Sequence, residues 1–340
     1  MKAPLSNKGL ENDLMKRLKN LYDRIISIEN LELGDVLARK GKSDNKHVLE
    51  HDKNREENIL KLHHALKNKT YTTSKYNTFK IYEPKERLIF SLNYYPDRIV
   101  HHALMNVLEP IFVKTFTVNT YSCIKGRGIH RAVDNLKNAL KDVDNTTHCL
   151  KLDVKKFYPS INHDILKQIL RRKFKDKDLL WLLDDIIDST DGVPIGNYTS
   201  QYFANLYLTY FDHWIKETKR VRYYFRYADD IVILSSDKHY LHTLLGEIKE
   251  YLSTNLKLTV KKNYQVFPVG VRGIDFLGYV FFSSTHVLIR KSIKKRFARM
   301  MKRNYNTHSF SSYNGWIKHC NGRHLLKKLT KQQNIYSEIS

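Results

Sequence analysis

The feature that most constrains this chain is the acidic step in Tyr227-Ala228-Asp229-Asp230. An aromatic run precedes it and an apolar run follows it, so a short turn between two strand-forming segments carries two carboxylates. A lone Asp-Asp pair after a strand is most often a solvated turn. Here a further acid, Asp153, ends the apolar run at residues 148–154. Acids at the ends of two strands can meet and hold two divalent cations, which drive in-line phosphoryl transfer.

The charge balance indicates a polyanionic partner. The chain has 340 residues, with 59 Lys and Arg against 35 Asp and Glu, a formal charge of +24. Nucleic acid is the first candidate and a membrane surface the weaker one. No run approaches the roughly 20 apolar residues of a spanning helix, so we expect no membrane partner. The three cysteines form no CxxC pair, which argues against a zinc site and favours a reducing, cytoplasmic setting.

Hydrophobic periodicity and turn residues divide the chain into segments. Helices are predicted at 10–40, 55–68, 97–112 (stopping near Pro110), 129–141, 162–172, 178–188, 200–219, 238–254 and in the tail 291–340. Strands are predicted as a pair within 76–90, at 148–154, as the acidic hairpin 222–235, at 258–267 and as a hairpin at 272–290, with loops at 41–53 and 192–196. The order from residue 148 onwards is that of a split βαβ, ferredoxin-like unit. That topology places Asp153 and Asp229 on neighbouring central strands.

Ordered motifs over roughly residues 20–330 resemble those of reverse transcriptases. They are LDVKKFYPSI from Leu152, YADD from Tyr227, FLGY from Phe276, KERLI from Lys85 and LKLTVKK from Leu256. The resemblance implies an α+β right-hand polymerase fold, whose ferredoxin-like palm carries the catalytic aspartates. It implies an N-terminal helical extension at 1–75, fingers at 76–147, a palm at 148–285 with a finger/palm insertion around 160–200, and a short basic helical thumb at 286–340.

One stretch of the sequence resembles a particular subfamily of reverse transcriptases. Residues 194–201, PIGNYTSQ, have the pattern IGxxxSQ, where intron and viral enzymes usually show QGxxxSP. This form is similar to the reverse transcriptases of diversity-generating retroelements, as are VHHAL from Val100, LEPIF from Leu108 and SYNGWIKH from Ser312. The family copies a template-repeat RNA into cDNA, misincorporates opposite adenine to diversify a target gene, and works with a small oligomeric accessory variability protein. The resemblance therefore implies a bacterial or phage-encoded, cytoplasmic enzyme.

The same resemblance assigns the metal and nucleotide residues. Asp153 and Asp229, with the carbonyl of Val154, would bind two Mg²⁺ ions, and Asp230 would support the catalytic site. Lys80 and Arg87 would reach the dNTP triphosphate, since Arg binds phosphate in bidentate fashion; a solvated basic hairpin is the alternative. Lys262 would donate a proton to pyrophosphate, a place that Lys261 fills equally well.

Further residues would select the nucleotide and grip the nucleic acid. Tyr158 matches a steric gate against ribonucleotides, with a core tyrosine as the alternative. Ile195 stands where more accurate relatives have glutamine, and an apolar side chain gives the dNTP no hydrogen bond; a plain apolar loop residue is the alternative. Gln201 would approach template or dNTP. Nucleic-acid contacts are expected from basic side chains of one turn and of the tail: Lys125, Arg127, Lys291, Lys294, Lys295 and Arg299.

Three rival functions remain. The first is another bacterial reverse transcriptase, derived from an intron or used in phage defence. The second is a non-catalytic RNA-binding protein on a polymerase scaffold, which the three intact aspartates disfavour. The third is an RNA-templated RNA polymerase, which Tyr158 disfavours. The 58 residues after Phe282 are too few for a thumb together with an RNase H or endonuclease domain.

Overall fold

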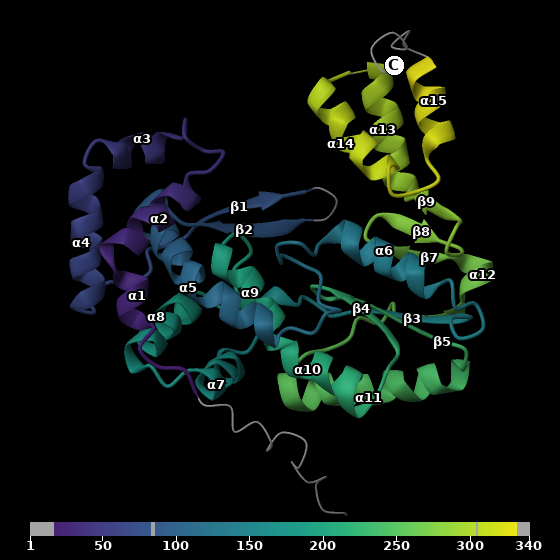
Figure 1. Cartoon of the computed structure of the whole chain (residues 1–340), viewed down its shortest axis with the longest axis horizontal. Helices are drawn as coiled ribbons and strands as arrows, with labels where there is room; N and C mark the ends of the chain where they lie inside the picture. Colours follow the sequence, from purple (N-terminus) through teal and green to yellow (C-terminus); the bar gives the residue numbers. More distant parts are fainter. Residues whose placement is uncertain (1–16, 83–85, 304, 332–340) are drawn as a thin grey trace, which may run out of the picture. The chain divides into compact units, whose positions relative to one another are not determined.

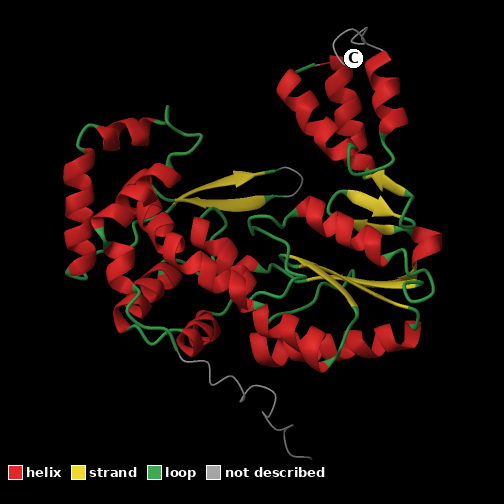
Figure 2. Cartoon of the chain, viewed as in Figure 1, coloured by secondary structure: helices red, strands yellow, loops and turns green. Residues whose placement is uncertain are grey.

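The computed structural model describes residues 17–82, 86–303 and 305–331. The chain divides into two compact units, one built from Met1–Thr115 with Tyr158–Tyr207 and the other from Phe116–Phe157 with Leu208–Ser340. Helices dominate the first unit, and the second combines sheets with helices (Figure 2). Across the described residues, no helix is long and apolar enough to span a bilayer.

The first unit consists of a helical body and one strand pair. Its helices are α1 (Tyr22–Ile26), α2 (Ile28–Ala38), α3 (Lys46–Asp52), α4 (Arg55–Lys67), α5 (Ile99–Thr115), α7 (His163–Lys173), α8 (Lys177–Asp188) and α9 (Tyr198–Tyr207). The short turns η1 (Tyr94–Arg98) and η2 (Tyr158–Ser160) complete them. Strands β1 (Asn77–Ile81) and β2 (Arg87–Ser91) form the predicted antiparallel pair, and the turn residues 83–85 lie outside the described residues.

Two sequence expectations fail in this unit. The segment 41–53 is not a loop throughout, because α3 forms where the Asn45 side chain accepts a hydrogen bond from the His47 amide at 3.0 Å and Val48 is buried. Helix α5 does not stop near Pro110 but continues to Thr115. A helix-interior proline is costly, but beyond it Phe112 is completely buried and packs edge-on against Phe174, with 6.0 Å between ring centroids.

The predicted helix at 10–40 is also shorter than expected. Helix α1 begins only at Tyr22, and α2 follows it after Ser27, whose hydroxyl caps the Asn30 amide at 3.2 Å. Residues 10–16 lie outside the described residues.

The second unit contains a four-stranded antiparallel sheet in the order β4-β5-β3-β6. Its strands are β3 (His148–Asp153), β4 (Tyr223–Tyr227), β5 (Asp230–Ser235) and β6 (Gln265–Pro268). This is the strand order of a split βαβ unit, so the sequence prediction is confirmed. Helix α11 (Lys238–Leu256) covers one face, and α6 (Ile129–Ala139) and a second sheet lie over the other (Figure 1).

The second sheet contains the FLG motif. Strands β7 (Ile274–Phe276), β8 (Tyr279–Phe281) and β9 (Val287–Ile289) form a three-stranded antiparallel sheet where one hairpin was expected, and α12 (Val269–Arg272) precedes them. Gly278 has φ +86°, and a Cβ there would lie 2.4 Å from the Trp316 ring. The motif needs glycine because the β7–β8 turn requires a left-handed residue with no side chain.

Two other predicted elements differ in length. The long helix expected at 200–219 is broken at Leu208 into α9, α10 (Thr209–His213) and the turn η3 (Trp214–Thr218). The strand expected at 258–267 begins only at Gln265, and an isolated bridge joins Val260 to Val154 upstream of it.

The tail is helical, as predicted, as far as Lys331. It folds into α13 (Lys291–Arg303), α14 (Thr307–Ile317) and α15 (Arg323–Lys331), around a small core of Phe297, Met301, Ile317 and Leu329. The expected borders of fingers, palm and thumb stay predictions.

Candidate active site

The acidic turn is a two-residue loop held in a strained conformation. Tyr227 pairs with Asp230 across β4 and β5, so Ala228 and Asp229 alone form the turn. Ala228 has φ +53°, a left-handed conformation that is uncommon for residues other than glycine. Its amide donates to Ser122 Oγ at 3.1 Å, and its carbonyl accepts from Arg226 Nη1 at 3.0 Å. These two bonds fix the position from which Asp229 projects.

Asp153 and Asp229 interact directly. Burial, a hydrogen bond to Asp153 and the charge of Asp153 together raise the pKa of Asp229 to about 7. The Lys261 ammonium forms an ion pair with Asp153, and the Lys261 amide donates to the Asp153 carbonyl at 2.8 Å. Asp229 therefore holds a proton near neutrality, as expected for a carboxyl group beside a second negative charge in a poorly solvated place.

Asp230 is the third acid of this cluster. It lies directly opposite Asp153 in the β3–β5 register, so both side chains are on the same face of the sheet. Burial raises the pKa of Asp230 to about 6, although the Lys151 ammonium, 4.0 Å away, opposes the shift. Lys151 also donates to the main-chain carbonyl of Asp275, which fixes its ammonium beside Asp230.

The acids fit a divalent cation. When they are ionised, Oδ1 of Asp153 and Oδ1 of Asp230 are buried and have no hydrogen-bond donor among the described residues. Such orphaned oxygens are costly unless a proton or cation satisfies them. Oxygen donors are those that Mg²⁺ prefers, and Mg²⁺ usually keeps several water or phosphate ligands beside one or two carboxylates. In the described part of the chain, no group of three or more His, Cys, Asp or Glu side chains is placed to hold a metal. Carboxylates are therefore the donors that the structure brings together, and the Val154 carbonyl stays a predicted ligand.

Of the two lysines left open by the sequence, Lys261 contacts the acids. Its side chain reaches Asp153, whereas Lys262 is exposed. Periodicity alone did not separate them, because the predicted strand at 258–267 is only a single bridge at this point. The role given to Lys262 stays a prediction.

Most of the residues expected at the nucleotide lie in the first unit. Of these, Tyr158 and Ile195 lie in neighbouring segments of the structure. The Val193 amide donates to the Tyr158 carbonyl at 3.0 Å, and the Phe90 amide donates to the Ile195 carbonyl at 2.8 Å. Gly196, at φ +135°, packs so closely that a Cβ would lie 2.0 Å from the Phe90 carbonyl oxygen. The Tyr158 turn and the Ile195 loop are thus fixed beside each other and against β2.

Lys80 and Arg87 are not brought together. Lys80 pairs with Leu88 and Arg87 with Ile81, so their side chains lie on opposite faces of the strand pair. Lys80 forms an ion pair with Glu86 at 2.7 Å, and both side chains are more than half exposed. Gln201 is exposed on α9.

The residues predicted to contact nucleic acid differ in their exposure and in their hydrogen bonds. Arg127 Nη1 donates to the carbonyls of Thr117 and Thr120 at 2.7 and 3.1 Å, so this guanidinium helps to hold a loop. Lys125 is exposed. On α13, Phe297 and Met301 are buried and the predicted basic residues are all exposed, namely Lys291, Lys294, Lys295 and Arg299.

Sequence reasoning missed the groups that support the acidic turn. Arg226 is completely buried, and its Nε donates to Asp212 Oδ1 at 2.7 Å. Asp212 also accepts from the Tyr224 hydroxyl at 2.5 Å and the Thr120 hydroxyl at 3.0 Å. An arginine inside the aromatic strand that precedes the turn was the available signal, because a buried charge requires a partner.

A four-stranded sheet in split βαβ order with carboxylates at a central turn is typical of template-directed nucleotide polymerases. The chain belongs to the reverse transcriptase (RNA-dependent DNA polymerase) family, whose model matches residues 74–281.

The curated relatives include a bacterial protein and proteins named after introns. Protein YkfC of Escherichia coli (strain K12) is 25% identical over 60% of this chain and 63% of its own length. The putative COX1/OXI3 intron 2 protein of Saccharomyces cerevisiae is 21% identical over 54% of this chain and 29% of its own length. The chain thus spans less than two thirds of the length of these relatives.

Solved structures share the fold at low identity. A telomerase from Candida albicans, in complex with a fragment of telomeric RNA, has a TM-score of 0.50 and 12% identity, covering 71% of this chain and 52% of the telomerase. A Candida tropicalis telomerase with a telomeric RNA fragment has a TM-score of 0.50 and 13% identity, covering 77% and 55%. These likenesses agree with a right-hand polymerase fold.

Proposed function

We propose that this protein is an RNA-directed DNA polymerase that extends a primer along a template RNA by a two-metal mechanism. The observation that carries the proposal is the half-buried, hydrogen-bonded pair Asp153–Asp229, within a domain of the reverse transcriptase family. Its substrates are dNTPs, a template RNA and a primer or growing cDNA strand.

The three acids have different roles in the proposed site. Asp153 and Asp229, with the Val154 carbonyl, would hold two Mg²⁺ ions. When bound, these ions activate the primer 3′ hydroxyl and neutralise the triphosphate. Lys261 orients Asp153 through their ion pair, and Arg226 fixes the turn through the Ala228 carbonyl. Asp230 adds negative charge opposite Asp153.

Residues of the first unit select the nucleotide. The ring of Tyr158 excludes a ribose 2′ hydroxyl, and Ile195 offers the incoming dNTP an apolar contact. The close packing of the Ile195 loop on β2 supports this role, because a fixed loop presents one side chain consistently. Lys80 and Arg87 stay the predicted contacts of the triphosphate, although their side chains lie on opposite faces of the strand pair. Gln201 stays the predicted contact of template or nucleotide.

The finer proposal is an adenine-mutagenic, cytoplasmic enzyme of a diversity-generating retroelement, acting with a small oligomeric accessory protein. Residues 194–201 support it, because their IGxxxSQ pattern replaces the glutamine of more accurate relatives with Ile195. The intron-derived or phage-defence enzyme is the alternative, and the names of the curated relatives favour the intron side.

Primer extension on a defined RNA tests the polymerase proposal. Asp229→Asn should lower magnesium-dependent dNTP incorporation more than ten-fold, because it removes a metal ligand. The matched control Asp144→Asn changes an exposed carboxylate in the same unit and should retain full activity, and thermal melts should show both variants folded. Activity of Asp229→Asn above a tenth of the wild type contradicts the metal assignment. Preferred use of NTPs contradicts the choice of dNTPs.

A further inference from the structure

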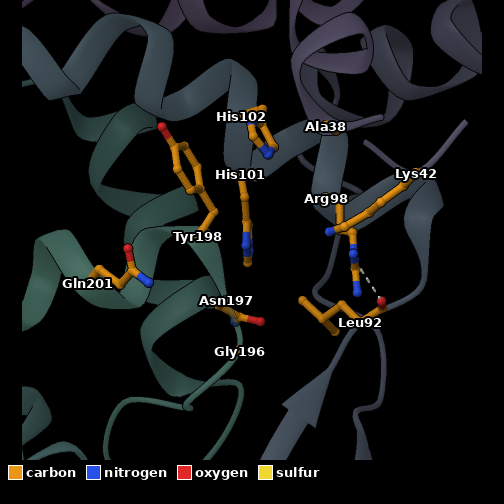
Figure 3. A pocket seen from close by; sticks show the side chains of 10 residues that line it. All are labelled: Ala38, Lys42, Leu92, Arg98, His101, His102, Gly196, Asn197, Tyr198 and Gln201. Atoms are coloured by element: carbon orange, nitrogen blue, oxygen red, sulfur yellow. Dashed lines mark hydrogen bonds between the residues drawn. The ribbon is translucent and has the colours of Figure 1, made fainter. Parts of the chain in front are cut away.

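The first unit contains a cavity of about 200 Å³ between the end of α2, helix α5 and the start of α9. Its walls include Lys42, Arg98, His101, His102 and Asn197 (Figure 3). The aromatic wall is rigid, because the His102 and Tyr198 rings stack 4.3 Å apart at 8°. None of the residues that line the cavity is acidic.

Two cations face this space without a carboxylate in its lining. Arg98 is fixed from behind, because its Nε donates to the Leu92 carbonyl and its Nη2 to Ser91 Oγ, both at 3.2 Å. Burial lowers the pKa of Lys42, and the charge of Arg98 lowers it further. Like charges close together repel each other, so an anion bound in the cavity would stabilise both cations.

His101 adds a buried ring nitrogen to which no described residue forms a hydrogen bond. The residue is 1% exposed, and its Nε2 has no hydrogen-bond partner among the described residues. Burial lowers the pKa of His101 to about 3, so the ring is neutral near pH 7 and carries one N–H. The ring extends from α5 toward Asn197 and Gly196 (Figure 3). A buried polar nitrogen without a partner calls for a ligand.

We propose that this cavity binds a phosphate group, which accepts hydrogen bonds from Lys42, Arg98 and the His101 Nε2–H. A metal cation is excluded by the two adjacent positive charges. An apolar ligand would leave the buried His101 Nε2 without a hydrogen-bond partner. The phosphate is either inorganic phosphate or one phosphodiester of an RNA strand. None of the acids at the candidate active site lines the cavity, whereas Gln201, the predicted contact of template or nucleotide, does. The metal-dependent reaction is therefore not needed to test the proposal.

Binding to the 340-residue chain in EDTA tests this site without the metal-dependent reaction. Calorimetry with inorganic phosphate is one arm, and fluorescence anisotropy with a short RNA lacking terminal phosphates is the other. Lys42→Gln removes one cation. His101→Phe replaces the imidazole by another aromatic ring that has no N–H. Lys46→Gln is the matched control, since Lys46 is an exposed lysine of the same unit. Thermal melts verify that each variant is folded.

A charge-assisted bond of the usual strength corresponds to roughly ten-fold in affinity. Inorganic phosphate binding that weakens about ten-fold in Lys42→Gln and His101→Phe, but not in Lys46→Gln, supports a free-phosphate site. If inorganic phosphate does not bind, but the affinity for RNA falls in Lys42→Gln and His101→Phe and not in Lys46→Gln, the site binds a phosphodiester of an RNA strand. If neither ligand distinguishes Lys42→Gln and His101→Phe from the control, the proposal is wrong and His101 only fills the core.

Discussion

The Arg226 guanidinium and the Asp212 carboxylate form an ion pair in which both side chains are 0% exposed. The same guanidinium donates from Nη1 to the carbonyl of Ala228, the left-handed residue of the acidic turn. The pair thus connects the buried side of the sheet to the residue immediately before Asp229. Because Arg has several donors in a fixed planar fork, it makes these contacts at once, which lysine does not.

We therefore expect Arg226→Lys to impair catalysis through geometry. The charge is kept, but the bond to Ala228 is lost and the turn is free to shift. Primer extension should fall about ten-fold or more in kcat, with a smaller change in the KM for dNTP, since misplaced catalytic groups cost mainly the chemical step. Steady-state kinetics together with a thermal melt would measure this effect.

Asp212→Asn should instead lower the free energy of unfolding by about 3–5 kcal/mol, because it leaves the buried Arg226 charge unpaired.

The control for this substitution is Arg222→Lys. Arg222 lies just before the same strand but has 69% of its side chain exposed, and it pairs with Asp142 at 3.2 Å. It should behave as the wild type, because exposed ion pairs contribute about 0–1 kcal/mol. Equal kinetics for Arg226→Lys and Arg222→Lys would show that the buried guanidinium does not position the turn.

The acidic pair also predicts a pH dependence of stability. The pKa of Asp229 in the fold, about 7, lies above the value of about 3.9 for an unfolded Asp. The folded chain therefore binds this proton more tightly, and without metal the free energy of unfolding falls as pH rises from about 4 to above 7. Mg²⁺ competes with the proton, so the rise in Tm that it produces should be larger at about pH 8 than at about pH 6.

Melts with and without Mg²⁺ at the two pH values measure this linkage. Asp229→Asn should lose most of the pH-dependent metal response and should gain stability above neutral pH in EDTA. A rise in Tm that is the same at both pH values would mean that Asp229 is not where the metal binds.

Local patterns in the sequence predicted the sheet and its acids, and the limits of that reasoning have physical causes. Apolar alternation and the acidic step located β3, β4 and β5, and the predicted topology brought Asp153 near Asp229. It did not give the register, in which Asp230 lies opposite Asp153 and Asp229 lies in the turn. The partner of Arg226 was not predictable, because Asp212 lies 14 residues earlier and beyond a break in the helix. Polar composition at 41–53 concealed α3, since a capping Asn45 and one buried Val48 suffice to form a short helix.

The exposed basic stripe of α13 predicts a salt effect on RNA binding. Lys291, Lys295, Arg299 and Lys302 recur three or four residues apart, so they share one face of the helix. Each phosphate neutralised on a single strand contributes about −0.7 to the slope of log K against log salt. Lys295→Gln should therefore make the slope shallower by about 0.7, in anisotropy titrations over a range of KCl concentrations.

Lys238→Gln serves as the comparison, since Lys238 is an exposed lysine of α11 in the same unit. Its slope should equal that of the wild type. Identical slopes for all three proteins would indicate that α13 is a solvated helix face rather than a nucleic-acid contact.

Ile195 provides the most direct test of the mutagenic subtype. Its loop is fixed against β2 by the Phe90 amide and by the close approach of Gly196, so a new side chain at position 195 should occupy the same place. Ile195→Gln would supply a hydrogen bond to the incoming dNTP, worth about 1–1.5 kcal/mol. That corresponds to about a five- to thirteen-fold fall in misincorporation, and the fall should be largest opposite template adenine.

Sequencing cDNA copied from a defined RNA measures the error rate opposite each template base. Ile195→Leu, which stays apolar, should keep the wild-type error rate. If the wild type copies adenine as accurately as the other bases, the retroelement proposal fails, and an intron-derived or phage-defence reverse transcriptase takes its place.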